Sequence, residues 1–121
     1  MKRFMSERDL IKRTKQFALR IIRLCESLPK GRTSNTIAQQ LVKCGTSVGA
    51  NYRAAHRARS KADFIAKMGI VEEECDESIY WMELLIEASI IEEAKLKDLI
   101  DEANQILSIV VSSIKTARLR K

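Results

Sequence analysis

The scarcity of chain-breaking residues constrains this sequence more than any other feature. Its 121 residues include one proline and four glycines, and only the segment Pro29-Lys30-Gly31 combines the two. Most small all-β folds need many turns and collagen-like repeats need regular glycines, so this composition excludes both, as well as Pro/Gly-rich disorder. Because 45% of the residues are hydrophobic, the chain can bury one core. A single domain made of a few long helices is what remains.

Four segments repeat their apolar residues with the alternating three-and-four spacing of a helix that packs on one side. We expect helices at about 7–28, 35–58, 61–88 and 92–118, joined by three short connections. Their seams have near-heptad spacing. The predicted fold class is therefore all-α, an antiparallel up-down-up-down four-helix bundle that forms one domain over residues 1–121.

Three serines are candidate N-caps of these helices because their hydroxyls can accept a bond from the first turn. They are Ser6, Ser34 and Ser60. The first and the last are followed three residues later by an aspartate, which is a capping-box pattern. The boundary near Ala88-Ser89-Ile90 is marked by neither glycine nor proline.

A line of small residues runs along the second predicted helix, through Ala38, Gly45 and Gly49. A glycine inside a helix costs about 1 kcal/mol relative to alanine, so two of them need compensation. We expect a neighbouring backbone to approach closely at this line.

The third predicted helix is apolar on more than one side. Ile70, Trp81 and Leu84 project away from the seam that faces the core. An exposed apolar patch that contains a tryptophan is typical of a protein interface, so we predict that these residues mediate self-association. Two alternatives stay open: the patch is a groove for another partner, or Trp81 packs under the first connection.

The formal net charge of +6 hides a strong segregation. Residues 1–61 contain fifteen Lys and Arg against three Asp and Glu, whereas residues 62–114 contain three against thirteen. The last seven residues add four more positive charges. Half of the chain is therefore strongly cationic, which makes an acidic partner plausible without identifying it.

Two groups of basic residues are candidates for binding RNA or DNA through phosphates. The first lies on the arc of the first helix opposite its apolar face: Arg8, Lys12, Arg13, Lys15, Arg20 and Arg23. The second lies where the second helix ends: Arg53, Arg57, Arg59 and Lys61, with His56 among them. The same charges would also suit a solvated exterior, a helix C-terminus, or pairing with the acidic third helix of a neighbouring subunit. Arg53 has a further option, an ion pair with Glu72, Glu73 or Glu83.

No catalytic constellation, cofactor motif or metal-ligand spacing stands out. The single histidine, His56, has no Cys or second His nearby, and the acidic run at 72–77 lacks the Glu-x-x-His pairs of di-metal bundles. We therefore expect no enzyme activity, no cofactor, no metal and no small-molecule substrate. The absence of a long apolar run or signal peptide, and three scattered cysteines, predict a cytoplasmic protein without a membrane partner.

Several consecutive stretches resemble the bacterial four-helix bundle proteins related to those encoded in intervening sequences of 23S ribosomal RNA genes. The stretches are Thr46-Ser47-Val48-Gly49-Ala50-Asn51-Tyr52-Arg53-Ala54-Ala55, Arg59-Ser60-Lys61-Ala62-Asp63-Phe64-Ile65, Gly69-Ile70-Val71-Glu72-Glu73-Glu74, Glu77-Ser78, Tyr80-Trp81 and Glu83-Leu84-Leu85. The resemblance extends to the accessory proteins of diversity-generating retroelements. It covers nearly the whole chain.

This resemblance implies a bundle that assembles into homopentameric rings, and it implies no catalytic residue. For the accessory proteins it also implies binding to nucleic acid and to a reverse transcriptase. Ser47 and Asn51 match the family pattern of the second helix, where we expect Asn51 to form a hydrogen bond inside the bundle. Our hypothesis is a non-enzymatic homo-oligomer that presents its basic face to RNA or DNA. The alternative is a protein–protein scaffold or accessory subunit that uses its charges between subunits.

Overall fold

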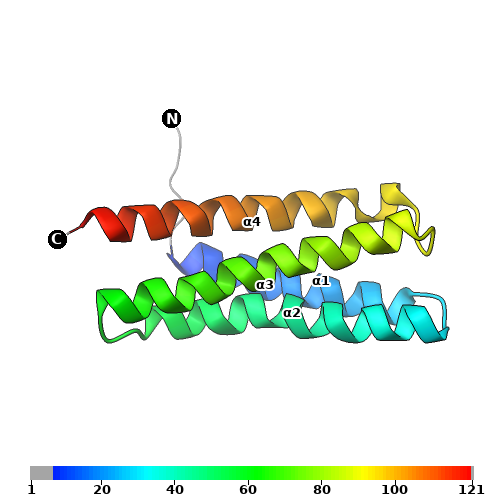
Figure 1. Cartoon of the computed structure of the whole chain (residues 1–121), viewed down its shortest axis with the longest axis horizontal. Coiled ribbons are helices and arrows are strands. Elements are labelled where there is room, and N and C mark those ends of the chain that lie inside the picture. Colours follow the sequence, from blue (N-terminus) through cyan, green and yellow to red (C-terminus); the bar gives the residue numbers. More distant parts are fainter. Residues whose placement is uncertain (1–6, 121) are drawn as a thin grey trace.

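The computed structural model describes the backbone of residues 7–120 and the side chains of residues 9–120. Four helices account for almost all of this part of the chain (Figure 1). They are α1 (Glu7–Ser27), α2 (Arg32–His56), α3 (Lys61–Glu87) and α4 (Glu93–Leu119). The predicted all-α four-helix bundle is confirmed.

Consecutive helices run antiparallel and pack side by side in the order α1, α2, α3, α4, and α4 meets α1 to close the bundle. The junction of α1 with α4 is the loosest of the four. The start of α1, the α2–α3 connection and the end of α4 lie toward one end of the molecule, on the left of Figure 1. Segments far apart in sequence therefore meet there.

All four helices contribute to one continuous core. Its fully buried side chains include Phe17 of α1, Leu41 of α2, Met68 of α3, and Leu96 and Ile106 of α4. Burying a side chain of this size contributes roughly 1.5–3 kcal/mol, so the seams at three-and-four spacing supply the main driving force for this fold.

The small residues of α2 do face α1 closely. A Cβ atom added at Gly45 would lie 2.9 Å from Cγ1 of Ile21, and one added at Gly49 would lie 3.3 Å from the backbone carbonyl of Thr14. Thr14 is fully buried and its hydroxyl donates to the carbonyl of Ile11. The predicted close approach of a neighbouring backbone is confirmed at Gly49.

The start of α3 is capped as predicted, because the backbone N–H of Asp63 donates to the Ser60 hydroxyl at 3.0 Å. The predicted cap at Ser34 is wrong. Helix α2 begins at Arg32 with Gly31 as its N-cap, and Ser34 lies buried inside the first turn. The third candidate, Ser6, lies outside the described residues.

Helix α3 ends at Glu87, close to the predicted boundary, although no glycine marks it. Ser89 takes the left-handed conformation (φ 58°), and the N–H groups of Ile90 and Ile91 donate back to the carbonyl of Leu85. Such a left-handed residue satisfies the last carbonyls of a helix and turns the chain out of it.

Candidate nucleic-acid interface

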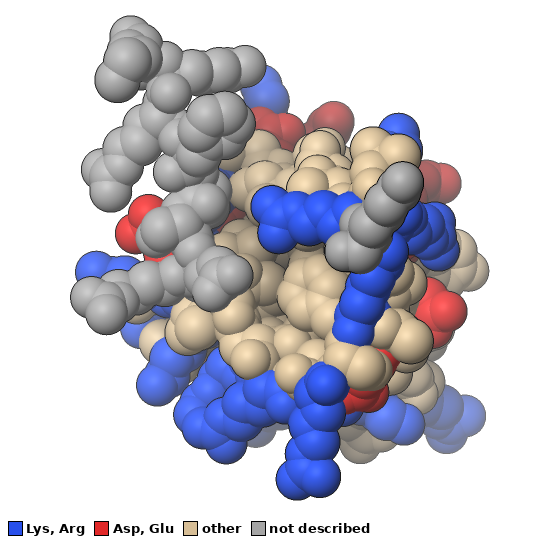
Figure 2. All heavy atoms as spheres, turned by 90° about the vertical axis from the view of Figure 1, so that its left-hand side faces the viewer, with Lys and Arg blue, Asp and Glu red and all other residues tan. Residues whose placement is uncertain are grey.

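Basic side chains from three segments gather at the end of the bundle that holds the α2–α3 connection. We call this surface the basic end and define it by eight Lys and Arg residues. They are Arg53, Arg57, Arg59, Lys61, Lys67, Lys115, Arg118 and Arg120. Figure 2 looks onto this end: Lys and Arg atoms crowd its lower rim and cross its centre, and Asp and Glu atoms appear in smaller areas around its edge.

The basic end is held together by contacts between its segments. The ammonium of Lys61, at the start of α3, donates to the backbone carbonyl of Arg120 at the end of α4. The one acidic residue within residues 53–67 and 115–120 is Asp63, whose carboxylate accepts two bonds from Lys67 at 2.8 and 2.9 Å. The bond from Lys67 also lowers the pKa of Asp63 below its ordinary value. The local charge is therefore strongly positive.

The arc of α1 extends this positive surface along one side of the bundle. Lys12, Lys15 and Arg23 are exposed, and Arg20 is half-buried. The side chain of Arg8 lies outside the described residues.

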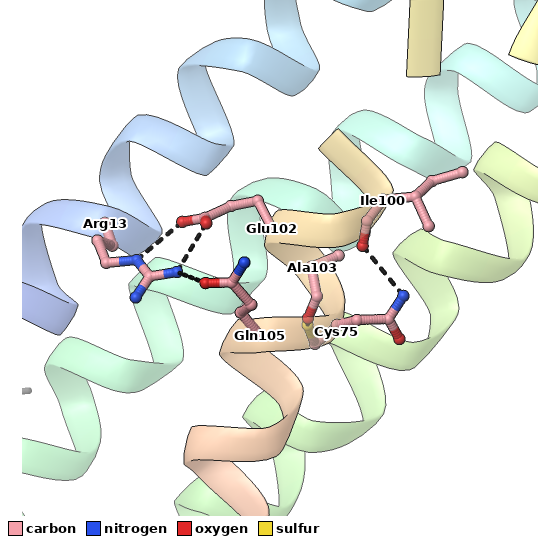
Figure 3. A network of polar contacts seen from close by, with 7 residues as sticks. Arg13, Cys75, Ile100, Glu102, Ala103 and Gln105 are labelled. Atoms are coloured by element: carbon pink, nitrogen blue, oxygen red, sulfur yellow. Dashed lines mark hydrogen bonds and ion pairs between the residues drawn. The ribbon is translucent and has the colours of Figure 1, made fainter. Parts of the chain in front are cut away.

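Arg13, also predicted on this arc, bonds to side chains of α4 (Figure 3). Its guanidinium donates to both carboxylate oxygens of Glu102 on α4, at 2.7 and 2.9 Å, and to Oε1 of Gln105 at 3.0 Å. The bond to Glu102 raises the pKa of Arg13 further above its ordinary value. Its charge is therefore used to join α1 to α4 at their loose junction.

Arg53 and Arg57 lie on a ridge between two hollows. The larger, between α1 and α2, has a volume of about 540 Å³ and is also lined by Lys15 and His56. The second, between α2 and α3, has a volume of about 440 Å³ and includes Lys67. The sequence left open an ion pair between Arg53 and a glutamate of α3. Among the described residues, Arg53 forms no such pair.

Comparison with known proteins places this chain in a family. Residues 6–112 match the family model described as 23S rRNA-intervening sequence protein. The chain belongs to this family. This chain is similar to a protein with unknown function from the S23 ribosomal protein family of Bacteroides thetaiotaomicron VPI-5482, for which there is a crystal structure. The two sequences are 33% identical, and the two structures have a TM-score of 0.84. The match covers 90% of this chain and 97% of that one. A search of the curated proteins finds no match.

Membership of the 23S rRNA-intervening sequence protein family agrees with the fold but brings no reaction with it. The description of the family names no enzymatic activity, and the structural relative is itself of unknown function. Within residues 9–120, no group of His, Cys, Asp and Glu side chains is arranged to hold a metal ion. None of the described helices is long and apolar enough to cross a membrane.

The family motif around Tyr80-Trp81 lies on the outer side of α3. Ile70 is 41% exposed and Tyr80 is 53% exposed, whereas Trp81 and Leu84 are half-buried. The indole N–H of Trp81 donates to Glu77 at 3.0 Å, and the rings of Tyr80 and Trp81 meet edge to face. Part of this surface is therefore already packed within the chain, while Ile70 and Tyr80 still face solvent.

The two helix-two positions that match the family pattern bond within their own helix. The amide of Asn51 donates to the carbonyl of Ser47 at 2.8 Å, and the hydroxyl of Ser47 donates to the carbonyl of Lys43 at 2.7 Å. Both side chains are half-buried. The bond of Asn51 thus stays within α2 and does not reach across the bundle.

Sequence reasoning left four residues out of the basic end. One is Lys67 of α3, and the other three are Lys115, Arg118 and Arg120 in the tail of the chain. The signal for these three was present as the four positive charges of the last seven residues. In an up-down-up-down bundle the second helix ends where the fourth does, so the predicted topology already placed this tail beside the Arg53-to-Lys61 cluster.

Proposed function

We propose that this chain is a non-enzymatic, homo-oligomeric bundle, pentameric like the rings that its family resemblance implies, that binds RNA or DNA through the basic end. The observation that carries the proposal is the convergence of eight Lys and Arg residues on one end, where Asp63, the one acidic residue within residues 53–67 and 115–120, is already paired with Lys67. Because three cysteines are free thiols, the proposal places the protein in the cytoplasm.

Phosphate contacts suit this surface better than solvation alone. Lys and Arg that neutralise phosphates release condensed counterions, and this release provides most of the affinity of sequence-independent binding. The exposed Lys12, Lys15 and Arg23 extend the charge along α1, which would allow contact with several successive phosphates.

Self-association would strengthen this binding. Ile70, Tyr80, Trp81 and Leu84 are the residues we propose at the contact between subunits, since two of them face solvent and four large apolar side chains lie on one surface. An oligomer repeats the basic end in every subunit, so that individually weak contacts add through avidity.

A charge-matched pair of variants tests the nucleic-acid contact. The first replaces Arg59, Arg118 and Arg120 by glutamine at the basic end. The second replaces Lys30, Arg32 and Lys95, three exposed cations at the opposite end, by glutamine. Both variants lose three positive charges, so the control removes the same net charge from a different place.

Binding is measured by fluorescence anisotropy with labelled single-stranded RNA, duplex RNA and duplex DNA at low salt. We expect the variant of the basic end to bind about a hundredfold more weakly and the control to stay within about threefold of the natural protein. Equal weakening in both variants would show that only the net charge matters and would contradict an interface at the basic end.

A further inference from the structure

The hollow between α1 and α2 is the cavity of the described surface with the clearest chemical character. Three exposed cationic side chains line it, Lys15 from α1 and Arg53 and Arg57 from α2. No carboxylate is among the described residues that line it. A concave site with one sign of charge concentrates ions of the opposite sign, so an anion is the ligand that this wall favours.

The rest of the cleft is small and largely apolar. Ile11 and Ala18 of α1 and Ala50 of α2 line it, together with the polar Thr46 and His56 of α2. Gly49, where the two backbones approach each other, also belongs to the lining. Its volume of about 540 Å³ is within the range of small-ligand sites. Such a cleft has room for a flat or apolar group beside the anion. Inorganic phosphate alone does not supply such a group.

We propose that the α1–α2 cleft binds one nucleotide unit, with its phosphate on Lys15, Arg53 and Arg57 and its sugar and base against Ile11, Ala18 and Ala50. Arg guanidinium groups bind phosphate oxygens through two parallel hydrogen bonds, and two of the three cations here are arginines. The inference deepens the proposed function and rests on it, because it names the site and the unit of nucleic acid that would enter it. The phosphate comes from a free nucleotide or from a residue within a chain.

The direct test is isothermal titration calorimetry of the full chain with uridine 5′-monophosphate, uridine and inorganic phosphate. We expect the monophosphate to bind about tenfold more tightly than either part alone, because only it engages both the cations and the apolar wall. Equal affinity for the monophosphate and for inorganic phosphate would overturn the proposal, since it would mean that the cleft merely attracts anions.

Two cleft variants and one control locate the site. Arg53→Gln removes a phosphate contact, whereas Ala50→Trp fills the cleft and keeps every charge. We expect each to weaken monophosphate binding by about tenfold, and Lys43→Gln, an exposed cation of α2 outside the cleft, to change it by less than about twofold. Unchanged binding in Ala50→Trp would overturn the site.

Labelled single-stranded RNA separates the two sources of phosphate. If Ala50→Trp weakens RNA binding and the monophosphate displaces the RNA, the cleft takes a nucleotide of the chain. If the monophosphate binds but does not displace RNA, the cleft takes the free nucleotide. If the natural protein does not bind the monophosphate and the Ala50→Trp variant still binds RNA, the proposed ligand site in the cleft is overturned. RNA binding by the basic end is then left intact.

Two further outcomes are distinct from these. Monophosphate binding without RNA binding would overturn the proposed function and leave the cleft. Dissociation of the oligomer by Ala50→Trp, together with no monophosphate binding, would overturn the cleft as a ligand site and assign it to a neighbouring copy.

Discussion

At the scale of single residues, two glycines of this bundle differ in the space available for a side chain. Gly45 lies against the buried side chain of Ile21, whereas nothing lies within 4 Å of the Cβ position at Gly69. The same substitution therefore separates packing from helix propensity, since alanine favours a helix by about 1 kcal/mol over glycine in both cases.

We expect Gly45→Ala to lower the free energy of unfolding by about 1 kcal/mol, because the overpacking at Ile21 exceeds the gain in helix propensity. Gly69→Ala, the matched control, should raise it by about 0.5–1 kcal/mol. Urea denaturation followed by circular dichroism measures both. A stabilised Gly45→Ala variant would contradict the close approach of α1 and α2.

The cysteines should be inert at neutral pH. Burial is the largest cause that raises the pKa of Cys25 and Cys44 from 9.0 to about 11, and that of Cys75 from 9.0 to about 12. Because the thiolate is the reactive form, we expect negligible alkylation by iodoacetamide at pH 8 in the folded protein and three adducts after unfolding, counted by mass spectrometry. Rapid modification of the folded protein would contradict the packing of these thiols.

The same thiols make stability depend on pH in the alkaline range. Their pKa values are raised on folding, so the unfolded chain releases these protons first, from about pH 9.0, whereas folded Cys44 does so near 11. Their contribution is fully present below pH 9 and is lost as the pH rises through this window.

At the scale of helices, the ion pair of Arg13 and Glu102 joins α1 to α4 at the loosest junction of the bundle. The carboxylate of Glu102 accepts both of its bonds from Arg13, and the two side chains are 20% and 25% exposed. We expect Glu102→Gln to lower the free energy of unfolding by about 0.5–1 kcal/mol, less at high salt, because partial exposure screens the pair.

The control for this ion pair is Asp101→Asn, which removes a carboxylate from an exposed neighbour on α4. Chemical denaturation should show a change of less than about 0.5 kcal/mol for it. If the two variants are equally stable, the contact of Arg13 contributes nothing to the junction.

The positions of the helices could be predicted from the sequence because each apolar seam must face one core. The residues at which the helices begin and end were harder to predict. Ser34 has the side chain of a cap, but Gly31 takes that place and Ser34 is buried in the first turn, where neighbouring helices decide its surroundings. The sequence predicted the helix boundary near Ser89 but not its cause. The cause is the left-handed conformation of this serine, which the amino-acid composition does not indicate.

The candidate interface was predictable in its two clusters but not in its membership. Periodicity places Arg13 on the same arc as Lys12 and Lys15, yet only the packing of α4 brings Glu102 to it. Conversely, the topology of the bundle, and not proximity in sequence, brings Arg120 into contact with Lys61. Charge patterns identify candidates, whereas the partners of each charge depend on tertiary contacts.

At the scale of the whole molecule, the outer surface of α3 tests the proposed assembly. We expect Trp81→Ala to shift the protein from oligomer to monomer in analytical ultracentrifugation, by weakening each contact about tenfold or more. Tyr80→Ser is a second probe that removes an exposed ring without opening the core. An unchanged oligomer in both variants, or a monomeric natural protein, would contradict assembly through α3.

The central claim is that the basic end binds the phosphates of RNA or DNA, and the dependence of affinity on salt tests it most directly. The account predicts that the logarithm of the association constant falls linearly with the logarithm of salt concentration, with a slope of about −4 to −7 on duplex for five to eight phosphate contacts. Substitution of Arg59, Arg118 and Arg120 by glutamine should reduce the slope by about three. Absence of binding at low salt, or binding that does not change with salt, would contradict the account.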